Sequence, residues 1–366
     1  MAELETEEVV LSAADGREGG GARPIDRSRR RLLRSAAWAM SAALVAPLSV
    51  MARGAAAQTA SDESYLRNLK SEFPKGQFER RAVPLDDFFD ATHRDGVPSI
   101  DHPRFAAAKD PWGVVAIEPV VSVVIGGEAR AYPFQILTWH EVVNDIVGGV
   151  PIAVSYGPQT SAVAVYDRRV GGATLEFGVT GRMRLANIVL YDRETESWWQ
   201  QYTGEAIVGA MTGARLKALP MRIESLARFQ ERQPAGQVQI PSSPAMRQYG
   251  HNPYPNYDTR EGPGRYFKGA LPKDVAPMAR VVVVGGEAWT LDLVRARKTV
   301  ASDDLTLSWQ PGQASALDTV MISSGRDIGN VVVQRKTAQG PVDVPYMVSF
   351  AFAFRAFNPE GRIRTS

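Results

Sequence analysis

Apolar and polar side chains alternate along residues 139–201, and pairs of glycine separate the alternating runs. Residues 150–156 carry an apolar side chain at every second position, which is the pattern of a half-buried strand. Gly148-Gly149 precedes this run and Gly171-Gly172 separates the next two runs. Paired glycines are typical of hairpin turns, because these turns need positive φ angles. The stretch is therefore predicted to be an antiparallel meander with its polar residues at the strand ends.

The rest of the pattern adds hairpins and short helices. A hairpin with a Gly126-Gly127 link covers residues 120–132, and Pro133 opens a short helix through Leu137, since proline at the first helical position sacrifices no hydrogen bond. Further helices are predicted at residues 61–72, 85–92 and 223–233, and two short strands between residues 203 and 219. The predicted fold class is mainly β with short helices, an α+β arrangement of antiparallel hairpins and meanders.

The chain contains an internal repeat. Residues 280–288 repeat residues 121–129 almost residue for residue, at an offset of 159. Ser308-Trp309-Gln310-Pro311 echoes Ser155-Tyr156-Gly157-Pro158 at an offset of 153, and the two echoes come in the same order. The pattern predicts two related β units packed as one body, with chance recurrence of glycine hairpins as the alternative.

The second unit lacks the polar residues of the first. Lys298-Thr299-Val300 stands roughly where His140-Glu141 would recur, so only the first unit is expected to carry a polar cluster. Duplicated units often place a site in the cleft between them. The predicted segments are an export signal (1–57), an N-terminal arm (58–113), a first β unit with the polar cluster (114–240), an aromatic, proline-rich loop (241–277) and a second β unit (278–366).

Three ordered motifs carry a family resemblance. They are Trp139-His140-Glu141-Val142-Val143-Asn144-Asp145, the turn Asp192-Arg193-Glu194-Thr195-Glu196-Ser197-Trp198 with Gln200 behind it, and Phe350-Ala351-Phe352-Ala353-Phe354-Arg355-Ala356-Phe357-Asn358-Pro359. Over residues 114–359 the chain resembles the bacterial family catalogued as domain of unknown function 3179. The resemblance implies no settled activity.

The chain departs from that family at one loop. Family members usually carry Tyr-Cys-Pro-Leu-Cys-Gly after the second strand of the meander, where this chain reads Tyr156-Gly157-Pro158-Gln159-Thr160-Ser161. The sequence contains no cysteine at all. A thiolate metal site or a dithiol redox couple at this loop is therefore excluded.

The N-terminus has the features of a twin-arginine export signal. Arg29-Arg30-Arg31 precedes an alanine-rich apolar run over residues 35–51, and Ala55-Ala56-Ala57 forms a small-residue cleavage site. The alternative is a transmembrane anchor, but the run is only about 17 residues long and contains Pro47. We expect cleavage after Ala57, no stable membrane span afterwards, the export machinery as a partner, and a periplasmic location.

Composition excludes one class of partner. Among 366 residues, 42 Lys and Arg oppose 40 Asp and Glu, and 44% are hydrophobic. This balance is ordinary for a globular protein and does not point to nucleic acid.

The candidate ligand-binding residues combine ionisable, amide and aromatic side chains. They are His140, Glu141, Asn144, Asp192, Arg193, Glu196, Trp198, Gln200 and Tyr254. Aromatic faces beside amides suit a small polar ligand or a protein partner, and the loop over residues 249–258 is predicted to cover the site. The alternatives are aromatic rings buried in the core and a structural salt-bridge network in the charged turn.

These residues favour a non-catalytic binding or accessory protein over an enzyme. The sequence has no His-x-x-x-His pair, and neither Ser161 nor Ser197 has the glycine-flanked elbow of a serine nucleophile. A hydrolase or metal-dependent enzyme that uses His140 and Glu141 is the alternative. In a glycoside hydrolase, a second carboxylate would have to lie about 5 to 10 Å from Glu141. The sequence identifies no catalytic residue, cofactor or metal site.

Overall fold

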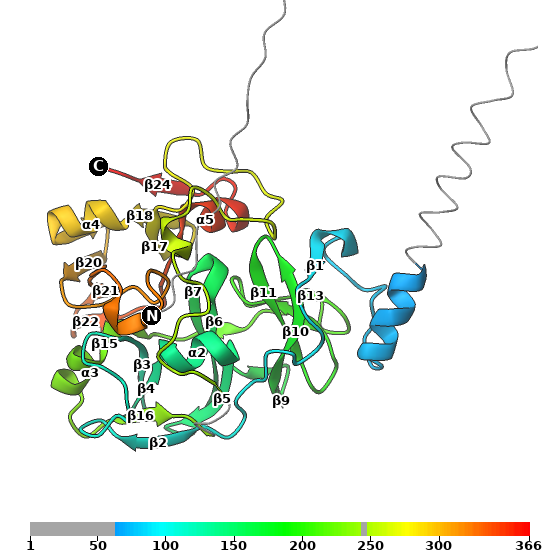
Figure 1. The fold of residues 1–366 in the computed structure, drawn as a ribbon, viewed down its shortest axis with the longest axis horizontal. Helices are drawn as coiled ribbons and strands as arrows, with labels where there is room; N and C mark the ends of the chain where they lie inside the picture. Colours follow the sequence, from blue (N-terminus) through cyan, green and yellow to red (C-terminus); the bar gives the residue numbers. More distant parts are fainter. Residues whose placement is uncertain (1–62, 243–246) are drawn as a thin grey trace, which may run out of the picture. The chain divides into compact units, whose positions relative to one another are not determined.

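The computed structural model describes residues 63–242 and 247–366, so the predicted export signal lies outside the described part. Within these ranges the chain is mainly β with short helices, which confirms the predicted fold class (Figure 1). Helical residues 63–72 agree with the helix expected there, whereas residues 85–92 form the 3-10 turn η1 (Leu85–Asp87) and the strand β1 (Phe88–Asp90) instead of a helix. None of the described helices is both long and apolar enough to span a bilayer.

The first β unit begins with a hairpin, a helix and a three-stranded meander. Its elements are β3 (Pro119–Ile125), β4 (Glu128–Pro133), α2 (Phe134–His140), β5 (Val142–Val147), β6 (Val150–Gly157), the 3-10 turn η2 (Pro158–Thr160) and β7 (Ala162–Asp167). Gly126 and Gly127 have φ angles of 57° and 83°, as the hairpin turn requires. Pro133 caps the helix and does not open it, because it still pairs with Val120 in the sheet, and the helix continues to His140.

The second β unit repeats this order of elements. It contains β17 (Arg280–Val284), β18 (Glu287–Thr290), α4 (Leu291–Arg297), β19 (Thr299–Ser302), β20 (Leu305–Gln310), the 3-10 turn η5 (Ile322–Ser324), β21 (Asn330–Thr337) and β22 (Gly340–Asp343). The residues that follow the two helices match in conformation, with φ 58° and ψ −31° at Glu141 and φ 61° and ψ −33° at Lys298. The carbonyl of Glu141 accepts from the Tyr156 amide at 2.8 Å, and that of Lys298 accepts from the Trp309 amide at 2.9 Å. Lys298 therefore occupies the position of Glu141.

Each unit closes with a strand, a helix and a second strand. In the first unit these are β15 (Arg222–Ser225), α3 (Leu226–Arg232) and β16 (Gln237–Ile240), and in the second β23 (Met347–Phe350), α5 (Ala351–Phe357) and β24 (Arg362–Arg364). β15 runs antiparallel to β3 and β16 parallel to β4, while β23 runs antiparallel to β17 and β24 parallel to β18. The helix predicted over residues 223–233 is thus shorter, because its first residues pair with β3.

The first unit carries an insertion that the second unit lacks. Between β7 and β14 (Lys217–Ala218) lie β8 (Arg169–Val170), β9 (Ala173–Thr174), β10 (Phe177–Arg184), β11 (Asn187–Asp192), β12 (Trp198–Gln200) and β13 (Glu205–Val208). Four of these strands join β1 in the sheet order β1-β10-β11-β12-β13, and β10 packs beside β5. In the second unit β21 leads directly into β22. The N-terminal segment also contributes β2 (Arg104–Ala107), which pairs with β16.

One hydrophobic core spans both units. Its buried side chains include Ile136 and Val154 from the first unit and Trp289 and Leu307 from the second. A separate cluster places Phe73, Phe78 and Phe88 of the N-terminal segment around Trp198. The two units therefore share their interior, as expected for related units packed as one body, and the N-terminal segment covers the inserted sheet.

Candidate functional site

His140 and Glu141 lie at the junction between α2 and β5. The positive φ of Glu141 is rare for a residue with a side chain, and it turns the chain sharply from helix to strand. Because neither residue lies within a regular strand, the two side chains need not point to opposite faces. Both are buried, at 8% and 5% exposure.

Both ring nitrogens of His140 are occupied. Nδ1 lies 2.8 Å from the carbonyl oxygen of Pro98, and Nε2 lies 2.8 Å from the hydroxyl of Tyr249, whose ring stacks against the imidazole. Burial lowers the pKa of His140, which favours the neutral imidazole. A neutral imidazole that faces a carbonyl through Nδ1 donates there, so Nε2 accepts from the Tyr249 hydroxyl. His140 thus holds the loop that carries Tyr249 by a hydrogen bond.

Glu141 is a buried carboxyl group whose pKa is shifted by burial and by no charged group among the described residues. Burial raises its pKa to about 8, and no hydrogen bond reaches the carboxyl group from the described residues. Tyr254 lies close enough for the two groups to interact electrostatically: burial, followed by the negative charge of ionised Glu141, raises the pKa of Tyr254 to about 12. At neutral pH Glu141 is therefore mainly protonated, and it can donate a hydrogen bond.

The aromatic loop covers this pair and joins the two units. The indole of Trp139 donates to the carbonyl of His251 at 3.2 Å, which adds a contact between α2 and the loop. On the other side, the amide of Asn252 donates to the carbonyl of Val320 at 2.8 Å, and the 3-10 turn η4 (Tyr257–Thr259) begins with an amide bonded to Leu317. The loop predicted to cover the site thus contacts His140 and is held against the second unit.

A buried ion pair continues the polar network into the second unit. Arg280 donates to Asp258 at 2.8 Å, to Ser315 at 2.9 Å and to Ser161 at 2.9 Å, and the Asp258 side chain is fully buried. Arg280 and Ser161 also line a cavity of about 20 Å³ together with Tyr156 and Gln313. Such a volume admits a single water molecule. The cavity beside Arg280 is therefore too small for a larger ligand.

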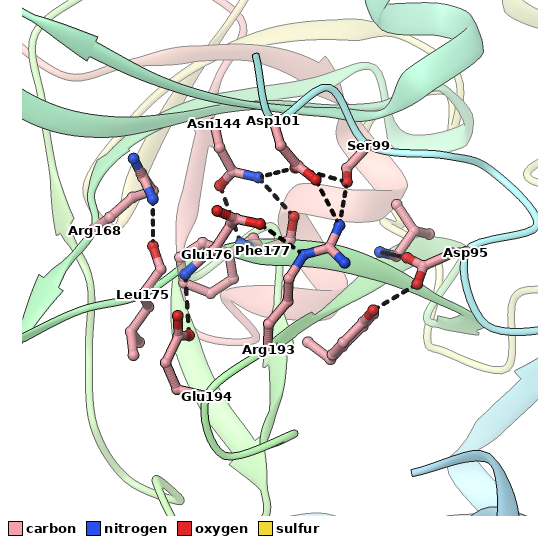
Figure 2. Close-up of polar contacts among 12 residues, drawn as sticks. Asp95, Ser99, Asp101, Asn144, Arg168, Leu175, Glu176, Phe177, Arg193 and Glu194 are labelled. Carbon is pink, nitrogen blue, oxygen red and sulfur yellow. Dashed lines mark hydrogen bonds and ion pairs between the residues drawn. The ribbon is translucent and has the colours of Figure 1, made fainter.

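Asn144 and Arg193 belong to a different network (Figure 2). The amide of Asn144 donates to Asp101 at 2.8 Å, and its oxygen accepts from the backbone of Phe177 at 3.0 Å. Arg193 points toward the same Asp101, 2.9 Å away, and pairs with Glu176 at 3.0 Å (Figure 2). These contacts tie the N-terminal segment to the meander and to the inserted sheet.

The charged turn organises the inserted sheet. Asp192 is fully buried and accepts from Thr195 and from the indole of Trp199 at 2.8 Å. Glu196 pairs with Arg94 at 2.7 Å. These contacts agree with the alternative prediction that the charged turn forms a structural salt-bridge network and does not bind a ligand.

Trp198 and Gln200 are buried in the inserted sheet. Trp198 lies beneath the phenylalanines of the N-terminal segment, and Gln200 donates to Asn187 at 2.7 Å. The nine predicted residues therefore occupy three places: His140, Glu141 and Tyr254 in one, Asn144 and Arg193 in a second, and Asp192, Glu196, Trp198 and Gln200 in a third. Over residues 63–242 and 247–366, no three His, Asp or Glu side chains are grouped so that they could hold a metal ion.

The sequence analysis did not identify several residues of the polar network around His140 and Glu141. Tyr249 and Asp258 lie in the loop predicted to cover the site, so their loop was identified but their contacts were not. Arg280 opens the repeated segment and carried no sequence signal for a site, since its partners Asp258 and Ser315 lie 22 and 35 residues away.

The loop that lacks the family's cysteines is packed by amide side chains. Asn187 donates to the hydroxyl of Thr160 at 2.9 Å and to the Gln201 side chain at 2.7 Å. A Cβ atom at Gly157 would lie only 2.7 Å from Asn187 Nδ2, so this packing leaves no room for a side chain at position 157. Hydrogen-bonded amides and a hydroxyl therefore surround the positions of the two thiols.

The fold and the site define a class of protein: an internally duplicated, mainly β protein with a buried histidine and carboxyl group beneath an aromatic loop. The chain belongs to the family described as protein of unknown function, DUF3179, whose family model matches residues 94–361. No curated protein and no solved structure matches the chain.

Proposed function

We propose that this protein is an exported, non-catalytic binding or accessory protein of the periplasm. Its recognition surface is formed by the C-terminal end of α2 and the loop over residues 249–258. The engagement of both ring nitrogens of His140, by Pro98 and by Tyr249, carries this proposal. With Nδ1 facing a backbone carbonyl and Nε2 accepting from a tyrosine hydroxyl, His140 positions the loop, and neither nitrogen is open to a metal ion.

The surface suits a small uncharged polar ligand or a protein partner. Trp139, Tyr249 and Tyr254 are half-buried, so each offers part of a ring to a ligand while the rest of the ring is packed. Aromatic side chains with one polar atom are favoured at binding surfaces, because they bury apolar area and can still form a hydrogen bond. Glu141 beneath them is neutral at pH 7 and does not demand a cation.

One observation supports a hydrolase as the second candidate. A buried carboxyl group with its pKa raised to about 8, on a residue with strained backbone, has the properties of a general acid. In this alternative, water attacks the scissile bond while Glu141 protonates the leaving group, once the loop over residues 249–258 opens.

Native mass spectrometry of the protein isolated from the periplasm tests the proposal. The expected result is a co-purifying small molecule or protein that is lost in Trp139→Ala and Tyr254→Ala. Tyr65→Ala is the matched control, because Tyr65 is half-buried and packs against the separate cluster around Trp198 in the N-terminal segment. A bound mass that persists in both site variants contradicts the proposed surface.

Two further measurements separate binding from catalysis. A Glu141→Gln preparation that carries the same bound mass as the wild type supports binding, whereas a different mass indicates that the wild type converts its ligand. Stoichiometric metal retained after dialysis would also overturn the non-catalytic proposal. For export, replacing Arg29 and Arg30 by lysine is expected to leave the protein in the cytoplasmic fraction after osmotic shock, and unchanged release would contradict it.

Loop docking is tested by hydrogen exchange. Tyr249→Phe removes the hydroxyl that bonds His140, and faster exchange is expected over residues 249–258. Tyr257→Phe is the matched control, since its hydroxyl bonds Pro263, six residues further along, and does not contact α2. Equal exchange in the two variants would show that His140 does not hold the loop.

A further inference from the structure

A second, open cleft lies where the two units meet on the side of the inserted sheet. It has a volume of about 310 Å³, and its walls come from β7 and the segment around β14 on one side and from β17 and β23 on the other. The apolar lining includes Val163, Val165, Leu219, Met221, Val283 and Met347. The volume lies at the lower end of the range for small-molecule sites, which are mostly apolar with a few polar groups.

At the corresponding junction between the units, the two strands are hydrogen-bonded to each other. There β15 pairs with β21 through Ile223 and Val331, and the hydroxyl of Tyr346 bridges the same two residues, accepting from Ile223 N at 2.9 Å and donating to Val331 O at 2.5 Å. The strands that correspond to β15 and β21 are β23 and β7. They lie side by side, yet no ladder joins them in the described part of the chain.

A sequence difference accounts for this asymmetry. Tyr346 directly precedes β23, and Met221 stands at the matching position before β15. Methionine has no hydroxyl group with which to bridge the neighbouring strands. The insertion then lines the open junction, because Tyr202, Thr203, Arg215 and Leu216 all face the cleft. The cleft therefore lies at the junction where this strand pairing is missing.

The polar groups of the cleft gather at one end. The ring centroids of Tyr202 and Phe357 lie 4.4 Å apart in a stacked pair, and the residues that follow them, Thr203 and Asn358, both line the cleft. The amide of Leu216 donates to the carbonyl of Gly204 at 2.8 Å, so Arg215 lies beside the same turn. Arg215 is the only charged residue that lines the cleft among the described residues; it is 66% exposed and pairs with Glu205 through Nη2. Its remaining guanidinium donors suit a carboxylate.

We propose that this cleft binds a small monocarboxylate with an apolar body. The apolar body lies between β7 and β23, and the carboxylate meets Arg215, with Thr203 and Asn358 as further hydrogen-bonding groups. The cleft shares no lining residue with the His140 and Glu141 centre. The inference therefore does not depend on the function proposed for that centre.

Isothermal titration calorimetry with decanoate and decanol tests this assignment. The wild type is expected to bind both probes, and Arg215→Gln is expected to weaken decanoate up to about fivefold while leaving decanol unchanged. Ala218→Trp fills the cleft from an exposed position on β14 and is expected to abolish binding of both probes. Val342→Trp is the matched control on β22 of the second unit, where the side chain is also exposed.

The outcomes are decisive in both directions. Absence of decanoate binding to the wild type at millimolar concentration, or undiminished binding to Ala218→Trp, overturns the site. An equal effect of Arg215→Gln on decanoate and decanol overturns the role given to the carboxylate. If Ala218→Trp does not fold, Met347→Trp fills the cleft from the opposite wall and carries the same expectation.

Discussion

Replacing Glu141 by glutamine removes a carboxyl group that the fold keeps protonated. The pKa of this group rises from the ordinary value of 4.5 to about 8 because the group is buried. At 1.36 kcal/mol per pH unit, this difference corresponds to about 5 kcal/mol of preference for the protonated form. Glutamine is close to glutamic acid in shape and does not ionise in this range, so Glu141→Gln isolates the cost of ionisation.

The sign of the pH dependence follows from the two pKa values. Between pH 4.5 and about 8 the unfolded chain has released the proton and the folded chain still holds it. Folding then takes up a proton, so the wild type loses stability as the pH rises through this window. Relative to the wild type, Glu141→Gln is expected to gain about 3 kcal/mol between pH 5 and pH 8.

Urea denaturation at pH 5, 6.5 and 8 measures this gain, since the slope with denaturant should not change. Lys298→Gln is the matched control: Lys298 has the same backbone conformation at the corresponding position and an exposed side chain. Its effect on the free energy of unfolding is expected to be independent of pH. If Glu141→Gln and the wild type show parallel stability curves from pH 5 to pH 8, Glu141 is ionised in the fold and the reasoning is wrong.

Three other variants test the packing and the buried charges. Trp198→Ala is expected to lose about 3 to 5 kcal/mol and to speed hydrogen exchange over residues 63–92, whereas Trp112→Ala, at 43% exposure, should be nearly neutral in the same assays. Asp258→Asn leaves buried Arg280 without its counter-charge and is expected to lose about 3 to 5 kcal/mol at pH 7, measured by denaturation. Burial raises the pKa of Asp258, but the opposing effect of Arg280 and its neighbours is larger, so the pKa lies below the ordinary value of 3.8. The stability from this pair is therefore present above pH 3.8 and is lost as the pH falls through the lowered pKa. An Asp258→Asn variant as stable as the wild type at pH 7 would contradict the role of the pair. Burial raises the pKa of Glu118 to about 7, so Glu118→Gln is expected to gain about 3 kcal/mol over the wild type as the pH rises from 4.5 to 7, and a difference independent of pH would refute it.

Local pattern determined most of the secondary structure. The strand over residues 150–156 and the glycine hairpin at Gly126 are where the alternation and the turn residues place them, because both depend on near neighbours in the chain. One error is of element type, because residues 85–90 form a 3-10 turn and a strand instead of a helix, and the others fall at element boundaries. Pro133 stays in the sheet, and residues 223–225 form a strand, because ladder partners far along the chain outweigh local helix preference.

By itself, the sequence determined the β-rich class, the internal repeat, and the presence of Lys298 in place of the His140-Glu141 pair. Only the tertiary structure decided which polar residues share a place. His140 bonds partners 42 and 109 residues away in the sequence. Glu196 instead forms an ion pair with the N-terminal segment, and Trp198 packs against that segment. Composition shows which groups need a partner when buried, but the packing of distant segments decides which partner each group receives. For the same reason the open cleft beside Met221 could not be foreseen, since it depends on a strand pairing that forms at one junction and not at the other.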